Sequence, residues 1–333
     1  MKKIISISLV LMLLLGVLAV PAMAEQKQPA KIGVLTMLNV DEAKMKEILT
    51  ARRILMTKAR ELSNAESTKP ASETERDMEP VFYDSLDSML MALNAGDIEG
   101  MEIYETTAKY LCANNSELTY GNHDNLDRTT KAADILFKGI LVNDFAFLMM
   151  EDHAALRDEF NTAIAAIKED GTMGKLVSAY IDGAIEGKEI PTFEIEKIDG
   201  AETIKVGITG DLPPMDYIAP DNTPAGFNTA LLAEISKRIG KNIELVQIHS
   251  AARSSALASG VVDVVFWTRT SDTAKQRINS SERKEPKSES AKEALSLISL
   301  EDYMTADMPE RTISTDSYFS DTLVIVSKKT EAE

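Results

Sequence analysis

The side chains best suited to nucleophilic chemistry are one cysteine and three histidines. Cys112 is the only cysteine of the chain, and the histidines are His123, His153 and His249. A catalytic thiol needs a base beside it, usually a histidine, to form its reactive thiolate. Nothing in the spacing of these residues pairs Cys112 with a histidine, and a lone cysteine allows no intrachain disulfide. We therefore expect Cys112 to be a small buried or half-buried side chain.

A second group of side chains offers oxygen and nitrogen donors for a metal ion. Asn122, His123, Asp124 and Asp127 stand close together in one polar stretch. Zinc and calcium sites need ligands at particular spacings, and this stretch has the spacing of neither. We interpret it as a solvated loop and predict neither a metal nor a cofactor for this protein.

The elements that must position any functional side chain follow a repeated pattern. Residues 81–103 and 246–266 each contain a short strand, then a helix that ends in Ala-Leu-x-[Ala/Ser]-Gly, then an apolar strand. Gly96 and Gly260 stand where a left-handed backbone ends a helix without steric cost. The apolar runs that follow them are typical of strands buried in a parallel sheet.

Each repeat is preceded by another strand and helix. Residues 30–39 and 203–214 place a basic residue before a β-branched strand, and helices are predicted at about 41–62 and at 228–239. The chain therefore contains two β-α-β-α-β units, each a small parallel sheet with helices on its faces. Between the units, 156–181 predicts two helices separated by a break at Asp170-Gly171-Thr172.

The beginning of the chain and its charge restrict the compartment and the partners. Residues 1–24 have a basic start, an apolar run and an Ala-Met-Ala end, which predicts a cleaved secretory signal. The alternative is an uncleaved N-terminal anchor. No cysteine follows the apolar run, so we expect no lipid-anchored lipoprotein. The formal net charge of −17 and the aromatic content of 5% argue against binding nucleic acid.

These motifs resemble those of extracellular solute-binding proteins of the polar-amino-acid uptake type, over nearly all of the mature chain. Residues 156–181, "LRDEFNTAIAAIKEDGTMGKLVSAYI", are similar to the closing helices of that family. Residues 204–240 are similar to its opening, 318–329 to the strand that leaves its first lobe, and 79–100 to its second lobe. The resemblance implies a two-lobed, periplasmic-binding-protein-like α/β fold of type II, in which each lobe is a small, mostly parallel sheet flanked by helices.

The order of these segments is rotated relative to the family, because the second lobe and the closing helices precede the first lobe. Since each segment occurs once, the order predicts a circular permutation, which is tolerated where chain ends lie at the surface. The new ends, near Lys31 and Lys329, would then leave one covalent crossing between the lobes, around 145–150. The predicted domains are 1–24 signal peptide, 31–150 second lobe, 151–182 closing helices, 183–203 linker and 204–329 first lobe.

The resemblance implies a non-enzymatic protein of the periplasm that closes two lobes over an amino acid or similar small polar solute and delivers it to an ABC permease. We expect a monomer, with a lobe-swapped dimer as the alternative. Two other functions stay open. One is an enzyme on the same scaffold, similar to exported cyclohexadienyl dehydratases. The other is a degenerate lobe pair that acts as a sensory or protein-interaction module.

The binding site is expected at the carboxyl ends of the parallel strands, in the loops 209–217, 266–270, 36–41 and 103–106. The family places an aromatic residue after its Pro-Pro pair, where this chain has Met215 and then Tyr217, and an arginine for the ligand carboxylate after the third strand. Arg269 and Arg277 are the candidates for that arginine. In the second lobe, Tyr104 replaces the family's ammonium-binding aspartate, so either Glu105 or Glu102 supplies the charge or the ligand is not an ordinary α-amino acid. The predicted ligand-binding residues are Asn39, Tyr104, Glu105, Met215, Tyr217, Trp267, Thr268, Arg269, Thr270 and Arg277.

Overall fold

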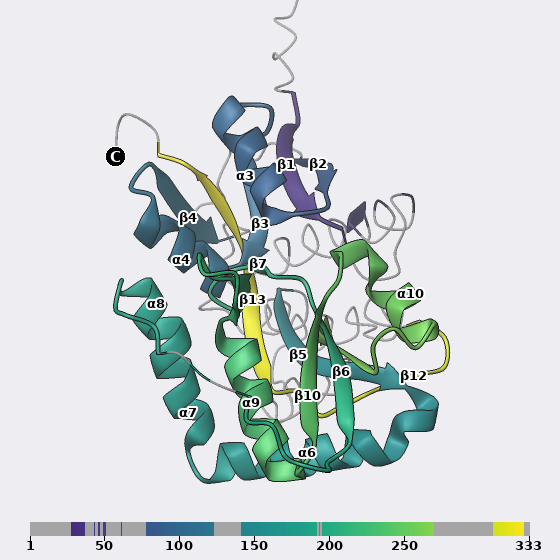
Figure 1. The fold of residues 1–333 in the computed structure, drawn as a ribbon. Coiled ribbons are helices and arrows are strands. Elements are labelled where there is room, and N and C mark those ends of the chain that lie inside the picture. Colours follow the sequence, from purple (N-terminus) through teal and green to yellow (C-terminus); the bar gives the residue numbers. More distant parts are fainter. Residues whose placement is uncertain are drawn as a thin grey trace, which may run out of the picture.

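The fold was obtained from a computed structural model of the 333-residue chain. The structure describes residues 28–36, 43, 46, 49–50, 61, 78–122, 141–191, 193, 195–269 and 309–329. In Figure 1 these residues form an upper lobe and a lower lobe, each containing a sheet with helices beside it. We call the upper one the second lobe and the lower one the first lobe, following the order that the sequence predicted.

The second lobe contains three parallel strands, with β1 between β2 and β3. An antiparallel strand continues its sheet beyond β3, and β4 pairs with that strand at the edge. The two helices follow the second and third strands, as expected for units that alternate strand and helix. The elements are β1 (Ala30–Leu35), β2 (Met78–Tyr83), α3 (Leu86–Ala95), β3 (Gly100–Tyr104), α4 (Glu105–Asn114) and β4 (Leu118–Asn122).

The first lobe repeats the plan, with β6 between β10 and β11 in a parallel arrangement. A small antiparallel sheet of β7, β8 and β9 lies between β6 and α9 in the sequence. The elements are β6 (Thr203–Ile208), β7 (Asp211–Leu212), β8 (Asp216–Ile218), β9 (Pro224–Ala225), α9 (Phe227–Ile239), β10 (Asn242–Gln247), η3 (Ser250–Ala252), α10 (Arg253–Ala258), β11 (Val264–Arg269) and β12 (Thr312–Ser314).

The predicted closing helices pack against the first lobe (Figure 1). Gly171 ends the first of them, with φ of 78°, a left-handed conformation that glycine adopts at no steric cost. The Asp170 carboxylate accepts a hydrogen bond from Thr172 N at 2.9 Å and so begins the next helix. The predicted helix, break and second helix are therefore confirmed. The elements are η1 (Glu151–His153), α6 (Ala154–Glu169), α7 (Thr172–Leu176), a π-helix (Val177–Asp182) and α8 (Gly183–Ile185).

Two long strands lie where the sheets meet, and one of them, β13, passes from one sheet into the other. The first half of β5 (Val142–Met150) pairs with the first half of β13 (Phe319–Lys328), and the second half of β5 pairs with β11. The second half of β13 pairs with β3 in the second lobe. The expectation of a single crossing is therefore wrong, because β13 continues into the second-lobe sheet instead of ending at the boundary. We call β5 and β13 the crossing strands.

The chain segments that begin β1 and end β13 lie close together. Gly33 of β1 and Val326 of β13 are both paired with Met101 of β3, so the three residues form one row across the sheet. Two strand spacings correspond to about 10 Å. Because β13 runs antiparallel to β3 and β1 runs parallel to it, Lys31 and Lys328 lie at the same edge of the sheet. Such an arrangement agrees with the expected permutation, which stays a prediction.

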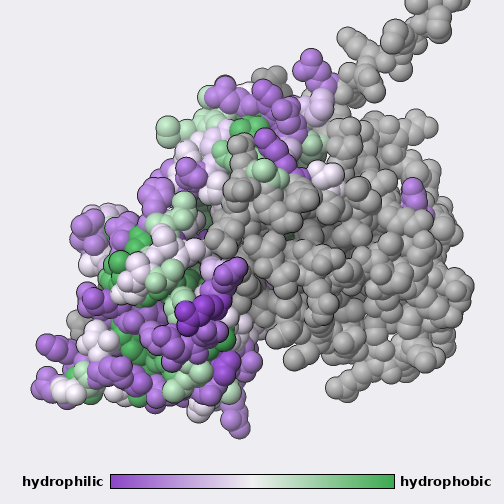
Figure 2. Space-filling model, turned by 90° about the vertical axis from the view of Figure 1, so that its right-hand side faces the viewer, coloured by the Kyte–Doolittle hydropathy of each residue, from purple (hydrophilic) through white to green (hydrophobic). Residues whose placement is uncertain are grey.

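Each lobe has its own apolar core. The larger cluster joins the crossing strand β5, the closing helices and α9, with Phe145, Phe160 and Phe227 among its fully buried side chains. The smaller one joins α3 to β3 and to the second half of β13. The two cores meet at the crossing strands. On the face shown in Figure 2, apolar areas of the described residues are interrupted by hydrophilic ones.

The linker predicted at 183–203 is attached to the first lobe. The Asn242 side chain, at the start of β10, accepts a hydrogen bond from Ile198 N at 2.7 Å and donates to the carbonyls of Ile198 and Ala201. Ile190, Phe193 and Ile195 pack against the first-lobe core. Among the described residues, no helix has the length and apolarity that crossing a membrane requires. The predicted signal 1–24 and most of the predicted helix 41–62 lie outside the described residues.

Candidate site at the junction of the lobes

The carboxyl ends of the parallel strands of both lobes lie at the crossing strands. Tyr104, the last residue of β3, pairs with Leu323 of β13, and Arg269, the last residue of β11, pairs with Phe145 of β5. Phe145 in turn pairs with Phe319 of β13. The structure thus brings two predicted site residues from different lobes, Tyr104 and Arg269, to the same junction, as expected for open α/β sheets.

Tyr104 joins the second lobe to the crossing strands. Its ring lies edge-on to that of Phe145, with centroids 4.8 Å apart and planes at 87°. Such an edge-to-face arrangement is favourable because the positive ring edge meets the negative face. Tyr104 is also the N-cap residue of α4, without a side-chain capping bond. It is half-buried and packs against the first-lobe core.

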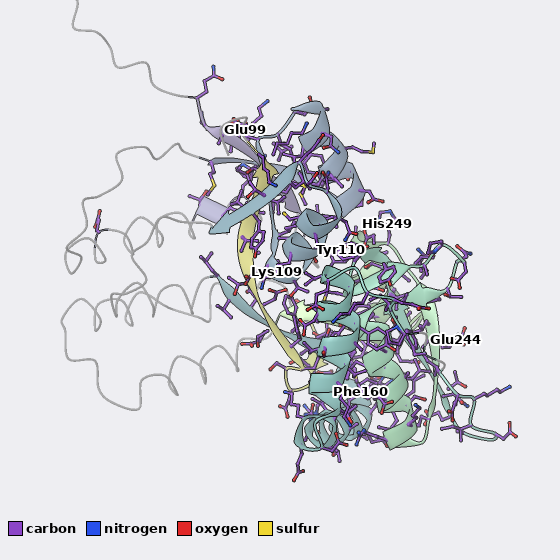
Figure 3. All side chains as sticks on the ribbon, turned by 90° about the vertical axis from the view of Figure 1, so that its left-hand side faces the viewer. Glu99, Lys109, Tyr110, Phe160, Glu244 and His249 are labelled. Carbon is purple, nitrogen blue, oxygen red and sulfur yellow. The ribbon has the colours of Figure 1, made fainter. Side chains whose placement is uncertain are left out.

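The predicted charge of Glu105 is already paired within α4. Its carboxylate lies 3.0 Å from Lys109 Nζ, one turn along the helix, and both side chains are partly exposed. The pairing raises the pKa of Lys109, and Asp321 of β13 contributes a smaller increase. Figure 3 shows Lys109 and Tyr110 on α4, at the level where the second lobe meets the first. A solute ammonium group at Glu105 would have to share this carboxylate with Lys109.

A buried carboxylate lies beside the start of α4. Asp321 is only 6% exposed and accepts a hydrogen bond from Thr106 N at 3.3 Å and one from Thr322 N at 2.7 Å. The N-terminus of a helix favours such an anion. Burial nevertheless outweighs these bonds and raises the pKa of Asp321 from 3.8 to about 6, with a smaller contribution from Glu105. The sequence analysis did not identify this residue, whose available signal was an acid within the apolar strand "FSDTLVIV".

The loop 209–217 is shaped by a second buried carboxylate. Asp216 Oδ2 accepts hydrogen bonds of 2.9 Å from Thr209 N, Thr209 Oγ1 and Gly210 N, while Oδ1 has no partner in the described structure. Burial raises the pKa of this carboxyl group, and the three bonds oppose the increase. The Pro213–Pro214 bond in the same loop is cis. These contacts close the loop over the end of β6.

The two predicted residues of this loop differ in exposure. Met215 is fully buried in the first-lobe core, so in this conformation its side chain lines no solvent-facing site. Tyr217 is half-buried, and burial raises its pKa, with a smaller contribution from Tyr110 of α4 across the junction. Tyr217 is therefore the member of the pair that faces the second lobe.

One side chain of the loop crosses to the other lobe. Leu212, in β7, packs against the apolar cluster of the second lobe, which includes Leu93 and Met101. β7 lies in contact with α3, and α8 with α4. The two lobes are therefore in contact at two places, through β7 and α3 and through α8 and α4. Leu212 occupies part of the space between them.

The remaining predicted residues are described only in part or not at all. Trp267, Thr268 and Arg269 belong to β11, whose backbone is described without these side chains. Asn39, Thr270 and Arg277 lie outside the described residues. Their roles stay predictions.

A further arginine lies beside the same strand end. The guanidinium of Arg253, the first residue of α10, donates to the carbonyl of Phe266 at 3.4 Å and to that of Ser250 at 3.2 Å. It therefore stands beside the loop where the carboxylate-binding arginine was predicted. Arg253 was not predicted as a site residue because it follows the second strand of its lobe, not the third.

Comparison with known proteins agrees with this arrangement. Residues 204–286 match the model of the family described as bacterial extracellular solute-binding proteins, family 3. The matched segment begins at β6 and contains α9, β10, α10 and β11. The chain thus resembles these solute-binding proteins, as its sequence predicted, and the match lies in the lobe that contains the loop 209–217.

Solved structures with some likeness come from several kinds of binding protein. The ligand-binding component of an ABC-type import system from Staphylococcus aureus has 10% identity, with a TM-score of 0.38, over 91% of this chain and 66% of that one. The glutamate-bound core of GluR0 has 10% identity and a TM-score of 0.36, over 91% and 86%. A phosphate-binding protein from Streptococcus pneumoniae has 12% identity and a TM-score of 0.33, over 90% of this chain and 89% of that one. These values are too low to indicate a ligand, and no curated protein matches the sequence.

Proposed function

We propose that this protein is the periplasmic substrate-binding component of an ABC importer and that it binds an amino acid or similar small polar solute between its lobes. The observation that carries the proposal is the family match over 204–286, in a lobe whose parallel strands end at the junction. No reaction is needed, because a solute that binds the closed lobes more tightly than the open ones shifts the equilibrium toward closure.

The proposal includes export and a permuted order of lobes. The start of the sequence supports a cleaved signal at 1–24 and delivery to the periplasm. The adjacency of β1 and the end of β13 supports a permutation, because ends that lie about two strand spacings apart are readily joined or opened. The division into 31–150, 151–182, 183–203 and 204–329 is part of the same proposal, although β13 extends into the second-lobe sheet.

A thermal-shift screen of the mature protein tests the function. We expect at least one compound among amino acids, short peptides and organic anions to raise the melting temperature, because a ligand at 100 times its dissociation constant stabilises the folded state by about 2.7 kcal/mol. Prephenate and arogenate belong in the screen, and their turnover would indicate a dehydratase instead. A complete absence of shifts would contradict the proposal.

A matched pair of variants then locates the site. Glu105→Gln should weaken binding of any hit that carries an ammonium group, because the neutral amide removes the carboxylate at the junction. Asp97→Gln, at an exposed turn of the same lobe, should leave the affinity unchanged. Equal affinities for both variants would indicate that the ligand does not bind beside α4.

One observation favours a second function, a protein-interaction module without a solute. Leu212 of the first lobe packs against the apolar cluster of the second, so an apolar contact already joins the lobes without a solute. If the screen is repeated with Leu212→Ala, a solute binder that closes around its ligand should still show shifts. If neither the parent nor Leu212→Ala shows a thermal shift with any compound, the interaction module is favoured.

A further inference from the structure

The position of Asp321 is unusual because the chain changes sheets within two residues of it. Asp321 pairs with Asn143 of the other crossing strand, whereas Leu323 already pairs with Tyr104 of the second lobe. Bending between the lobes must be absorbed by residues at such a boundary. A change in the angle between the lobes should therefore alter the backbone and the contacts at Asp321.

The first turn of α4 holds both crossing strands at this boundary. Thr106 N donates to the carboxylate of Asp321 on β13, and the Tyr104 ring packs edge-on against Phe145 on β5. The Thr106 hydroxyl also bonds to Asp321, and both residues are buried. The residues at the start of α4 thus contact both crossing strands, and α4 also contacts α8 of the closing helices.

Among the residues that the structure describes, few charged groups lie near Asp321. On α4, Glu105 repels the carboxylate and Lys109, paired with Glu105 at 3.0 Å, partly offsets that repulsion. The paired residue on β5 is the uncharged Asn143, which is also buried. Asp144 pairs with Ser320 and, because side chains alternate along a strand, points to the opposite face. Burial therefore dominates, and the pKa of Asp321 is raised to about 6.

We propose that Asp321 is a positioning residue whose protonation controls the angle between the lobes. In the described conformation its carboxyl group is packed against the first turn of α4. Bending that separates the crossing strand from α4 admits water to this group. A hydrated carboxylate is stable, so the ionised form favours the bent, open arrangement and the protonated form favours the packed one.

The size of the effect follows from the difference between the two environments. If hydration returns the pKa of Asp321 from about 6 to its ordinary 3.8, proton binding favours the packed arrangement over the open one. A difference of about two pKa units corresponds to a change of about 100-fold in the equilibrium constant between pH 4 and pH 7. Acidification should therefore close the lobes in the absence of any solute. This inference deepens the proposed function, because closure is the step that traps a solute.

Distances between spin labels on the two lobes test the proposal. Labels at Met91→Cys, an exposed position of α3, and Lys237→Cys, an exposed position of α9, in a Cys112→Ser background report the separation of the lobes. Without added solute, the distance distribution should shift from a longer to a shorter component as the pH falls from 7.5 to 4.5, with most of the change between about pH 6 and pH 4. A distribution that does not change with pH would overturn the proposal.

Two variants distinguish positioning from general stability. Asp321→Asn, a neutral isostere, should show the short component at every pH. Thr106→Val removes the hydroxyl bond that stabilises the carboxylate, so its midpoint should move to higher pH. Asp199→Asn, at an exposed linker position, is the control and should behave like the parent protein. If Asp321→Asn keeps the pH response, another group is responsible and the proposal is wrong.

The outcome is independent of ligand discovery. A pH response that depends on Asp321 without any solute binding would support the hinge and contradict the solute-binding function. Solute binding with distances that do not change with pH would support the solute-binding function and contradict the hinge.

Discussion

At the scale of single residues, two buried carboxylates organise the junction, and they do so by different bonds. Asp216 closes the loop 209–217 through three hydrogen bonds to residues 209 and 210, and Asp321 joins a crossing strand to α4. Burial raises the pKa of both groups. A buried carboxylate is retained only where it is hydrogen-bonded, because an unpaired buried charge is strongly unfavourable. Both residues therefore mark positions where local geometry matters more than apolar packing.

Asp321 should make global stability depend on pH. Because its folded pKa of about 6 exceeds the unfolded value, the folded state binds a proton that the unfolded chain releases between about pH 4 and pH 6. The resulting stabilisation is complete below pH 4 and is lost as the pH rises through 6. At 1.36 kcal/mol per unit, the loss is about 3 kcal/mol. Urea unfolding should show that the free energy of unfolding of Asp321→Asn, relative to that of the parent, rises by this amount between pH 4 and pH 7. The control Asp199→Asn should show no such trend.

Replacement of Asp216 tests the loop. Asp216→Ala leaves three buried donors at residues 209 and 210 without their acceptor, and we expect a loss of roughly 2–4 kcal/mol in the free energy of unfolding. Asp216→Asn keeps one carbonyl oxygen for those donors, so its loss should be near 1 kcal/mol. Chemical denaturation measures both. Equal losses would show that the negative charge, and not the acceptor geometry, holds the loop.

At the scale of elements, the closing helices show how a local signal determines a boundary. Gly171 and Gly174 are three residues apart, but only Gly171 has a positive φ. A Cβ at either position meets no atom within 4 Å, so sterics with neighbours play no part. The difference between the two is purely one of backbone conformation.

The two glycines should respond in opposite directions to the same substitution. Gly171→Ala forces alanine into the left-handed region and should destabilise the protein by about 1 kcal/mol. Gly174→Ala, inside α7, should stabilise it by about 0.5–1 kcal/mol, because alanine restricts the unfolded chain and favours the helix. Thermal unfolding of the pair measures both signs. Destabilisation by both would indicate that α7 needs a flexible backbone.

At the scale of the whole molecule, the two crossing strands decide how the lobes communicate. β13 takes part in both sheets and β5 pairs with it in the first-lobe sheet, while Tyr104 and Thr106 at the start of α4 contact β5 and β13 at the boundary. The termini of the described fold lie about two strand spacings apart in the second lobe, on either side of β3, while the linker is held on the first lobe. The order of the segments along the chain can therefore be changed without changing their arrangement in space.

A rewired chain should fold to the same structure. Joining Lys329 to Lys31 through about four flexible residues spans the roughly 10 Å between the strands, and new ends can be opened in the linker between Gly187 and Gly200. We expect the same far-UV circular dichroism and a melting temperature within a few degrees of the parent. Opening the chain inside α9, most of whose residues are buried, should instead prevent folding. Failure of the linker-opened chain alone would contradict the proposed permutation.

Local order was predictable from the sequence, because it depends on residues close together in the chain. The α/β alternation, the glycine stops at Gly96 and Gly260, the break at Gly171 and the half-buried state of Cys112 all follow from propensity, capping and periodicity. The order of similar segments also predicted a junction between two lobes, at which the structure places Tyr104 and Arg269. The tertiary structure alone showed that β13 forms a second connection between the lobes and that Met215 is buried. It also showed that Leu212 contacts the other lobe and that Asp321 contacts α4. These features depend on register and on burial between residues that are far apart in the chain, and no local pattern encodes either.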